Sequence, residues 1–95
     1  MGAALQPGEE WRLELDSERG LWLVVLAHPG YFDFHLTDPG EGVLVSVFGY
    51  SQRISVTSGK DGEPGGWLEV GGTLIYIPRD QALEDLATCV GTVVL

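Results

Sequence analysis

The side chains best suited to metal chemistry lie between residues 28 and 41. His28, Asp33, His35, Asp38 and Glu41 are all of types that bind metal ions. Asp33 and His35 are two positions apart in an alternating segment, so a β-strand would place both side chains on one face. A metal site needs a third ligand, which only a turn residue such as Asp38 could supply. Polar residues alternate in the same way on the solvent face of a one-sided sheet, so we predict no metal ion or other cofactor.

None of the potentially reactive side chains belongs to a recognisable catalytic motif. Asp33 and His35 have no nucleophile or oxyanion hole nearby in sequence that would let them act as a general acid and base. Cys89, the single cysteine, follows acidic sequence, whereas a reactive thiolate needs an electropositive setting, so we expect a buried core thiol. The glycine-rich segment 59–66 lacks the Gly-Lys-Ser/Thr ending of a phosphate-binding loop and contains Asp61 and Glu63, which repel phosphate. These features predict a protein without enzymatic activity.

Length and charge limit the classes of partner. A chain of 95 residues, 44% of them hydrophobic, predicts one domain spanning residues 1–95 with a single core, and residues 1–8 are expected to be flexible. Fourteen acidic and five basic residues give a formal net charge of -9. This charge disfavours nucleic acid and anionic membranes and favours a cationic protein partner, although solubility alone also explains an acidic surface.

Cysteine content and hydropathy indicate the compartment. One cysteine excludes an internal disulfide and fits a reducing environment. The first residues lack the basic and long apolar stretches of a secretory signal, and the longest apolar run, residues 21–27, has the length of a strand. We therefore predict a cytoplasmic protein.

The spacing of apolar residues predicts an α+β fold. Apolar residues at helical spacing predict one helix from Pro78 or Asp80 to Val90, and Gly91 is expected to end it. Turns rich in glycine and proline separate the strands, and the longest of these, residues 58–66, is predicted to be mobile. The predicted fold is an antiparallel β-meander of about six to seven strands with one C-terminal helix packed on the sheet. Strands are predicted at residues 11–16, 31–36, 43–48, 53–57, 67–70 and 73–77, of which the last two could be one bent strand. The continuous apolar run 21–27 predicts a further strand, and 92–95 could add a last one.

Aromatic residues suggest both a core and a binding surface. The apolar run 21–26 predicts a central strand covered on both faces. Exposed aromatics flanked by carboxylates are typical of a surface that binds a cationic protein, although Trp67 could instead pack against the helix. The residues expected in the core are Trp11, Trp22, Phe32, Phe34 and Phe48. The residues predicted to bind the partner are Tyr50, Asp61, Glu63 and Trp67, with Asp38 and Glu41 as rim charges.

Residues 71–86, Gly-Gly-Thr-Leu-Ile-Tyr-Ile-Pro-Arg-Asp-Gln-Ala-Leu-Glu-Asp-Leu, resemble the close of small immunity proteins from bacterial polymorphic toxin systems, including inhibitors of deaminase toxins. In that class a glycine-rich loop leads into a strand, a proline and an amphipathic helix with alanine and leucine. The acidic β-meander before this segment is similar in character. The resemblance implies a non-enzymatic, cytoplasmic immunity protein that neutralises a cationic toxin domain by blocking its active-site cleft.

A second hypothesis comes from the apolar run 21–26. A strand covered on both faces needs a second covering layer, which another protein could provide. The chain would then be a structural or assembly module that self-associates, for example as a homodimer, or joins a larger complex through its sheet.

Overall fold

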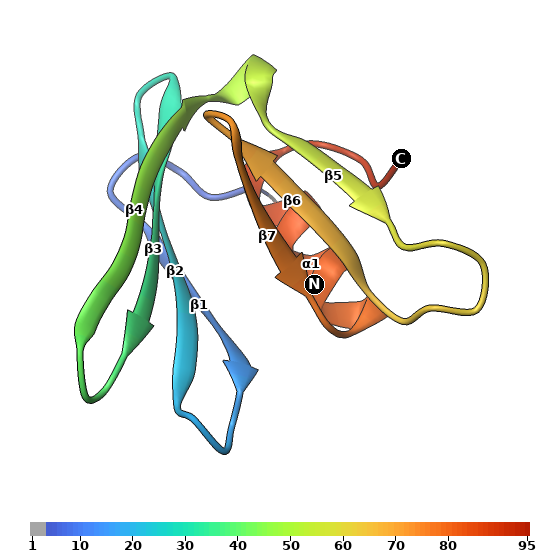
Figure 1. Cartoon of the computed structure of the whole chain (residues 1–95). Helices are drawn as coiled ribbons and strands as arrows, with labels where there is room; N and C mark the ends of the chain where they lie inside the picture. The colour runs from blue at the N-terminus through green and yellow to red at the C-terminus, as the bar shows by residue number, and fades with distance from the viewer. Residues whose placement is uncertain (1–3) are drawn as a thin grey trace.

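The chain folds into strands followed by one C-terminal helix, so the predicted α+β class is confirmed (Figure 1). The structure is a computed structural model that describes residues 4–95. Each predicted strand from residue 11 to residue 77 is present within a few residues of its expected ends. The elements are β1 (Glu10–Asp16), β2 (Leu21–His28), β3 (Tyr31–Asp38), β4 (Gly42–Tyr50), the 3₁₀ turn η1 (Ser51–Arg53), β5 (Ser55–Ser58), β6 (Gly66–Val70), β7 (Thr73–Ile77) and α1 (Asp80–Val90).

The strands form two antiparallel sheets, so the expectation of one continuous meander is wrong. Sheet A has the order β1-β2-β3-β4, and sheet B has the order β5-β6-β7. Within each sheet consecutive strands pair as hairpins. The chain turns at η1 after β4, and β5 then begins the second sheet instead of adding to the first (Figure 1).

A glycine allows the two sheets to approach each other. The side of β4 that carries Gly49 faces Val70 on β6, and a Cβ built at Gly49 would overlap Cγ2 of Val70. Gly71, in the turn after β6, has a φ of 55°, and a Cβ there would lie 2.9 Å from Cγ2 of Val47. Side chains at either glycine would therefore push β4 and the β6–β7 hairpin apart.

One hydrophobic cluster joins both sheets and the helix. The inward faces of β2 and β3 contribute to it, as do the inward faces of all three strands of sheet B. The apolar stripe of α1 contacts the same cluster. The largest fully buried side chains are Leu23, Val25, Phe34, Val56, Leu68, Val70, Ile77 and Leu86.

The outer face of sheet A is not covered by another element among residues 4–95. Val24 is nearly buried there by its neighbours, but Trp22 on the same face is 36% exposed. Phe48 is 55% exposed because it lies between Val47 and Gly49, whose positions face the core. The expectation of a β2 covered on both faces is therefore wrong, and so is the prediction that Trp22 and Phe48 belong to the core.

Glycine ends the helix as predicted. Gly91 has a φ of 75°, its N–H donates to the Thr88 carbonyl, and the N–H of Thr92 donates to the Ala87 carbonyl. This pair of bonds satisfies carbonyls that the last turn leaves free. α1 has 11 residues, and no helix within residues 4–95 is long and apolar enough to cross a membrane.

Both ends of the described chain are hydrogen bonded to the rest of the fold. The N–H of Leu5 donates to the Cys89 carbonyl at 2.9 Å, so part of the segment expected to be flexible is anchored, while residues 1–3 of that expectation lie outside the described residues. Val94 forms a parallel bridge with Val56 on β5. The last strand predicted at residues 92–95 is thus reduced to a single bridge.

Candidate protein-binding surface

Two of the exposed aromatic residues lie on the face of sheet B that points away from α1, while Trp22, Phe48 and Tyr50 are exposed on sheet A. Leu68 and Ile77 point toward the helix, so the residues that alternate with them point outward. Trp67 is 41% and Tyr76 is 40% exposed. They are direct cross-strand neighbours, and their ring centroids are 5.2 Å apart. We use the term outer face of sheet B for the outward side chains of Ser55, Thr57, Trp67, Glu69, Leu74 and Tyr76.

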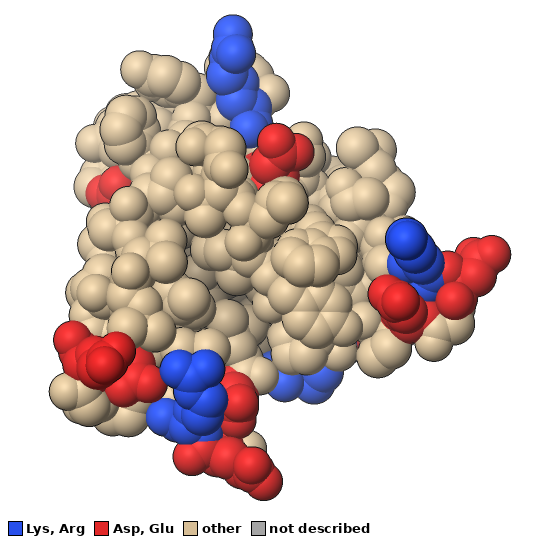
Figure 2. Space-filling view, in the orientation of Figure 1, with Lys and Arg blue, Asp and Glu red and all other residues tan. Residues whose placement is uncertain are grey.

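The charges near this surface are mainly acidic. Figure 2 shows a view with an uncharged central area and charged side chains toward its margins. Glu69 is the charged member of the outer face of sheet B, and Asp61 and Glu63 are exposed in the loop of residues 59–65 that leads into β6. Within residues 4–95, the salt bridges that form involve none of these three carboxylates. They are therefore available to a cationic partner.

The β5–β6 loop, residues 59–65, is closed by its own backbone hydrogen bonds. The N–H of Gly59 donates to the Gly65 carbonyl at 2.8 Å, and the N–H of Glu63 donates to the Lys60 carbonyl at 2.9 Å. These bonds define the loop conformation in a segment whose composition predicts mobility. Lys60 is exposed beside Asp61 and reduces the negative charge of the loop.

Two side chains fix the loop to the end of β7 and the start of α1. The Tyr76 hydroxyl donates to the Pro64 carbonyl at 2.7 Å, and the Gly65 N–H donates to Oδ1 of Asp80 at 2.6 Å. A Cβ at Gly65 would overlap the Ile77 carbonyl, so only glycine fits this approach. The acidic loop is consequently held next to the ring of Tyr76.

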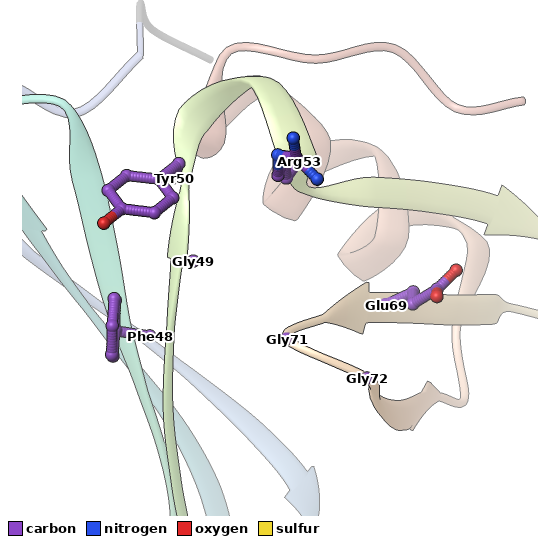
Figure 3. Close-up of a pocket in the computed structure, with 7 residues that line it drawn as sticks. All are labelled: Phe48, Gly49, Tyr50, Arg53, Glu69, Gly71 and Gly72. Atoms are coloured by element: carbon purple, nitrogen blue, oxygen red, sulfur yellow. The ribbon is translucent and has the colours of Figure 1, made fainter.

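Tyr50 lies beside a pocket between η1, the end of β4 and the β6–β7 turn (Figure 3). The cavity has a volume of about 350 Å³. In the close-up, Tyr50 and Phe48 point away from β6, while Arg53 and Glu69 come from opposite sides of the cavity. Phe48, Gly49, Tyr50, Arg53, Glu69, Gly71 and Gly72 line it. The lining contains no serine, cysteine or histidine, and its ionisable side chains are Tyr50, Arg53 and Glu69.

The predicted rim charges Asp38 and Glu41 lie far from the β5–β6 loop. They belong to the β3–β4 turn, which is at the lower left of Figure 1 while the loop is at the right. Oδ1 of Asp38 accepts the N–H groups of Gly40 and Glu41 at 2.8 and 3.2 Å, and its Oδ2 lies 3.6 Å from Arg19. Asp38 is thus used within its own turn.

The structure brings together only part of the predicted set. Trp67, Asp61 and Glu63 lie around one surface, whereas the Tyr50 ring points away from β6 even though Tyr50 and Glu69 line the same pocket (Figure 3). Sequence reasoning missed Glu69, Leu74 and Tyr76 as members of this surface. Alternation along β6 and β7 could have identified them, because the residues between buried positions must face outward.

Asp33 pairs with His28 instead of forming a metal site with His35. Oδ2 of Asp33 lies 2.8 Å from Nε2 of His28, and the His28 ring stacks on Tyr31 with centroids 4.6 Å apart. Throughout the part of the chain that the structure describes, no three His, Cys, Asp or Glu side chains are grouped closely enough to hold a metal ion. The polar residues of β3 therefore lie on the outer face of sheet A without forming a metal centre.

Cys89 is buried in the helix. Burial, together with the nearby Asp85 carboxylate, raises the pKa of the Cys89 thiol. The thiol therefore stays protonated at neutral pH, which makes it a poor nucleophile.

Comparison of the chain with known proteins gives no match to a protein family, to a curated protein or to a solved structure.

Proposed function

We propose that this chain is a non-enzymatic binding protein that docks a cationic protein on the outer face of sheet B. The observation that carries the proposal is the exposed Trp67–Tyr76 pair beside the carboxylates of Asp61, Glu63 and Glu69, none of which forms a salt bridge within residues 4–95. Protein interfaces are typically built from aromatic anchors at the centre and charged groups at the rim. The arrangement fits a partner with basic side chains around an apolar contact.

Charge supports a rapid encounter with such a partner. The formal net charge of -9 creates a negative field around a small protein, which attracts cationic proteins over distances of about 10 Å at moderate salt. Rim charges of this kind act mainly on the association rate. We expect Asp61 and Glu63 to increase the rate of association and Trp67 to slow dissociation.

The resemblance of residues 71–86 to immunity proteins supports a more specific form of the proposal. In this form the partner is a toxin domain, and the chain neutralises it in the cytoplasm by covering its active-site cleft. Residues 71–86 include β7 and the start of α1. Tyr76 and Leu74 from this segment belong to the outer face of sheet B, so the segment that carries the resemblance also supplies part of the binding surface.

Affinity capture from the native cell tests the proposal. The chain carries an N-terminal tag, which avoids the C-terminal residues that pair with β5, and co-purifying proteins are identified by mass spectrometry. We expect a basic protein that is captured by the wild type and lost with the double variant Asp61→Lys/Glu63→Lys. The matched control, Glu18→Lys/Glu41→Lys, makes the same change of net charge in the β1–β2 and β3–β4 turns and should capture the partner normally.

The same variants give a kinetic test with the captured partner. Reversal at Asp61 and Glu63 should slow association at low salt, and the difference from the wild type should shrink as salt is raised. Equal capture and equal association rates for both double variants would remove this surface from the interface.

A second candidate function is self-association through a sheet edge. β4 is an edge strand of nine residues without a charged side chain, whereas the opposite edge strand, β1, carries alternating charges. Natural proteins usually protect such edges with charges or proline. Sedimentation over a wide range of concentrations decides this case, since a dimer that dissociates on dilution favours an assembly module and a monomer throughout excludes pairing of β4.

A further inference from the structure

We infer that the outer face of sheet B holds its partner through an arginine side chain, which stacks on the Trp67–Tyr76 pair and forms an ion pair with Glu69. The inference rests on the proposed function and specifies the side chain that the partner contributes. It follows from the ring geometry, from the position of Glu69 and from the charges around the face.

The two rings form a preorganised aromatic site. They lie directly opposite each other on β6 and β7, with planes inclined at 56° and about two-fifths of each residue exposed. The bond from the Tyr76 hydroxyl to the Pro64 carbonyl fixes the tyrosine ring. A cation that binds here therefore meets rings that are already positioned, which lowers the entropy lost on binding.

Glu69 is placed to contact a cation that lies on the rings. It is two residues after Trp67 on the same strand and the same face, which corresponds to about 7 Å along the strand. Its cross-strand neighbours are Ser55 and Leu74, neither of which carries a charge, and Glu69 forms no salt bridge within residues 4–95. On the far side of Trp67 the neighbour is Thr57, a small residue that leaves that side of the indole open.

This combination favours arginine over lysine. A guanidinium is planar, so it can stack on an aromatic ring and still donate two parallel hydrogen bonds to a carboxylate. An ammonium group acts as a point charge and is more strongly hydrated. None of the six side chains of the outer face of sheet B is basic, and Arg53, which lines the neighbouring pocket with Glu69, forms no salt bridge with it.

Trp22 provides an internal comparison. It is exposed on the outer face of sheet A, but it forms no ring pair within residues 4–95, and Arg12 lies on the same face of the neighbouring strand. Glu14, the direct cross-strand neighbour of Trp22 on β1, has a carboxylate that forms no salt bridge within residues 4–95, so Trp22 differs from Trp67 mainly in lacking the second ring. A single exposed ring should therefore bind arginine more weakly than the Trp67–Tyr76 pair.

Titration of the isotope-labelled full chain with hexaarginine and with hexalysine, followed by NMR, tests the inference without a known partner. We expect hexaarginine to shift the indole N–H signal of Trp67 and to bind more tightly than hexalysine. The variants Trp67→Leu and Glu69→Gln should each weaken hexaarginine about two- to fivefold, the range expected for an exposed cation–π contact or ion pair. The control Trp22→Leu should weaken hexaarginine less than Trp67→Leu does.

Two results would overturn the inference. The first is that hexaarginine binds without shifting the Trp67 indole signal and binds the Trp67→Leu and Trp22→Leu variants with equal affinity. That result would mean that charge alone attracts the peptide. The other is no preference for hexaarginine over hexalysine. Neither result removes the proposed function, because capture of a basic protein that depends on Asp61 and Glu63 is measured separately.

Discussion

Substitution of Gly49 by alanine tests the close contact between the two sheets. The new Cβ would occupy the space of Cγ2 of Val70, which is fully buried and cannot rotate into solvent. Overpacking of a core by a single methyl group typically costs about 1–3 kcal/mol, because the backbone must shift. With a change of about 2 kcal/mol and a urea dependence of about 2 kcal/mol per molar, the unfolding midpoint should fall by about 1 M.

A double-variant cycle separates this overlap from a general effect of alanine. Val70→Ala alone removes two buried methyl groups and should cost about 2 kcal/mol. It also removes the carbon that a Cβ at position 49 would meet. In the Val70→Ala background, Gly49→Ala should therefore be nearly neutral, and the coupling free energy between the two positions should be at least about 1 kcal/mol.

Urea unfolding followed by circular dichroism measures all four proteins of the cycle. Effects that add within about 0.5 kcal/mol would refute the reasoning, since additivity indicates that the two residues do not share space. A Gly49→Ala variant as stable as the wild type would likewise mean that β4 and β6 are further apart than the structure places them.

The remaining predictions concern single contacts. Asp80→Asn keeps an acceptor for the Gly65 N–H but removes the negative charge of that acceptor, so it should lower the free energy of unfolding by about 1 kcal/mol in a urea titration. The amide hydrogen of Gly65 should also exchange faster in this variant. Arg79→Met removes the hydrogen bond from the guanidinium to the Glu14 carbonyl while keeping an unbranched side chain, with an expected loss of about 1 kcal/mol, and thermal unfolding that is unchanged would contradict a structural role for this contact. The raised pKa of Cys89 keeps the thiol of the native protein protonated, whereas the thiol of the unfolded chain ionises above its ordinary pKa of 9.0. The free energy of unfolding should therefore fall as the pH rises past 9.0, and the fall should be smaller in Cys89→Ala. In the wild type at neutral pH a thiol reagent should label Cys89 much faster after denaturation than before.

The local parts of the fold could be predicted from the sequence. Each hairpin is formed by neighbouring segments with period-two alternation and a turn that contains glycine, and these signals lie within about ten residues of each other. The helix was equally clear, because the spacing of Leu83, Leu86 and Val90 and the stop at Gly91 are local features. Strand positions therefore agreed closely with the structure.

The division into two sheets depends on contacts that alternation does not encode. Whether β5 pairs with β4 or starts a new sheet is decided at η1 and by the fit of Gly49 against Val70, which lies twenty-one positions later in the chain. A glycine in a strand signals a close approach but does not say which element approaches. The exposure of Phe48 follows from the same arrangement, since the side of β4 that faces β6 is the one that carries Gly49.

For the candidate surface, the sequence identified individual residues better than their grouping. Trp67 and the carboxylates of the β5–β6 loop were found by composition, because aromatic and acidic residues beside a loop are visible in the sequence. Asp38 and Glu41 were assigned to the same surface because the sequence does not show where a charged turn residue lies on the molecule until the hairpins are placed. Alternation along β7 already places Tyr76 outward, but its hydroxyl bond to Pro64 and its contact with Trp67 depend on the pairing of β6 with β7.

The parallel bridge between Val56 and Val94 has a consequence for synthesis of the chain. Sheet A contains only hairpins between consecutive strands, so all of its pairings can form once residue 50 has been made. β5 obtains its outer neighbour from residues 94 and 95: Val94 is the bridge partner of Val56, the Leu95 N–H donates to the Val56 carbonyl, and the Leu95 carbonyl accepts the Ser58 N–H. On the ribosome, where the N-terminal part emerges first, the strands of sheet A can pair while the β5 edge still awaits its last hydrogen bonds. The apolar inner face of sheet A nevertheless stays uncovered until sheet B and α1 pack on it, because one hydrophobic cluster joins all three.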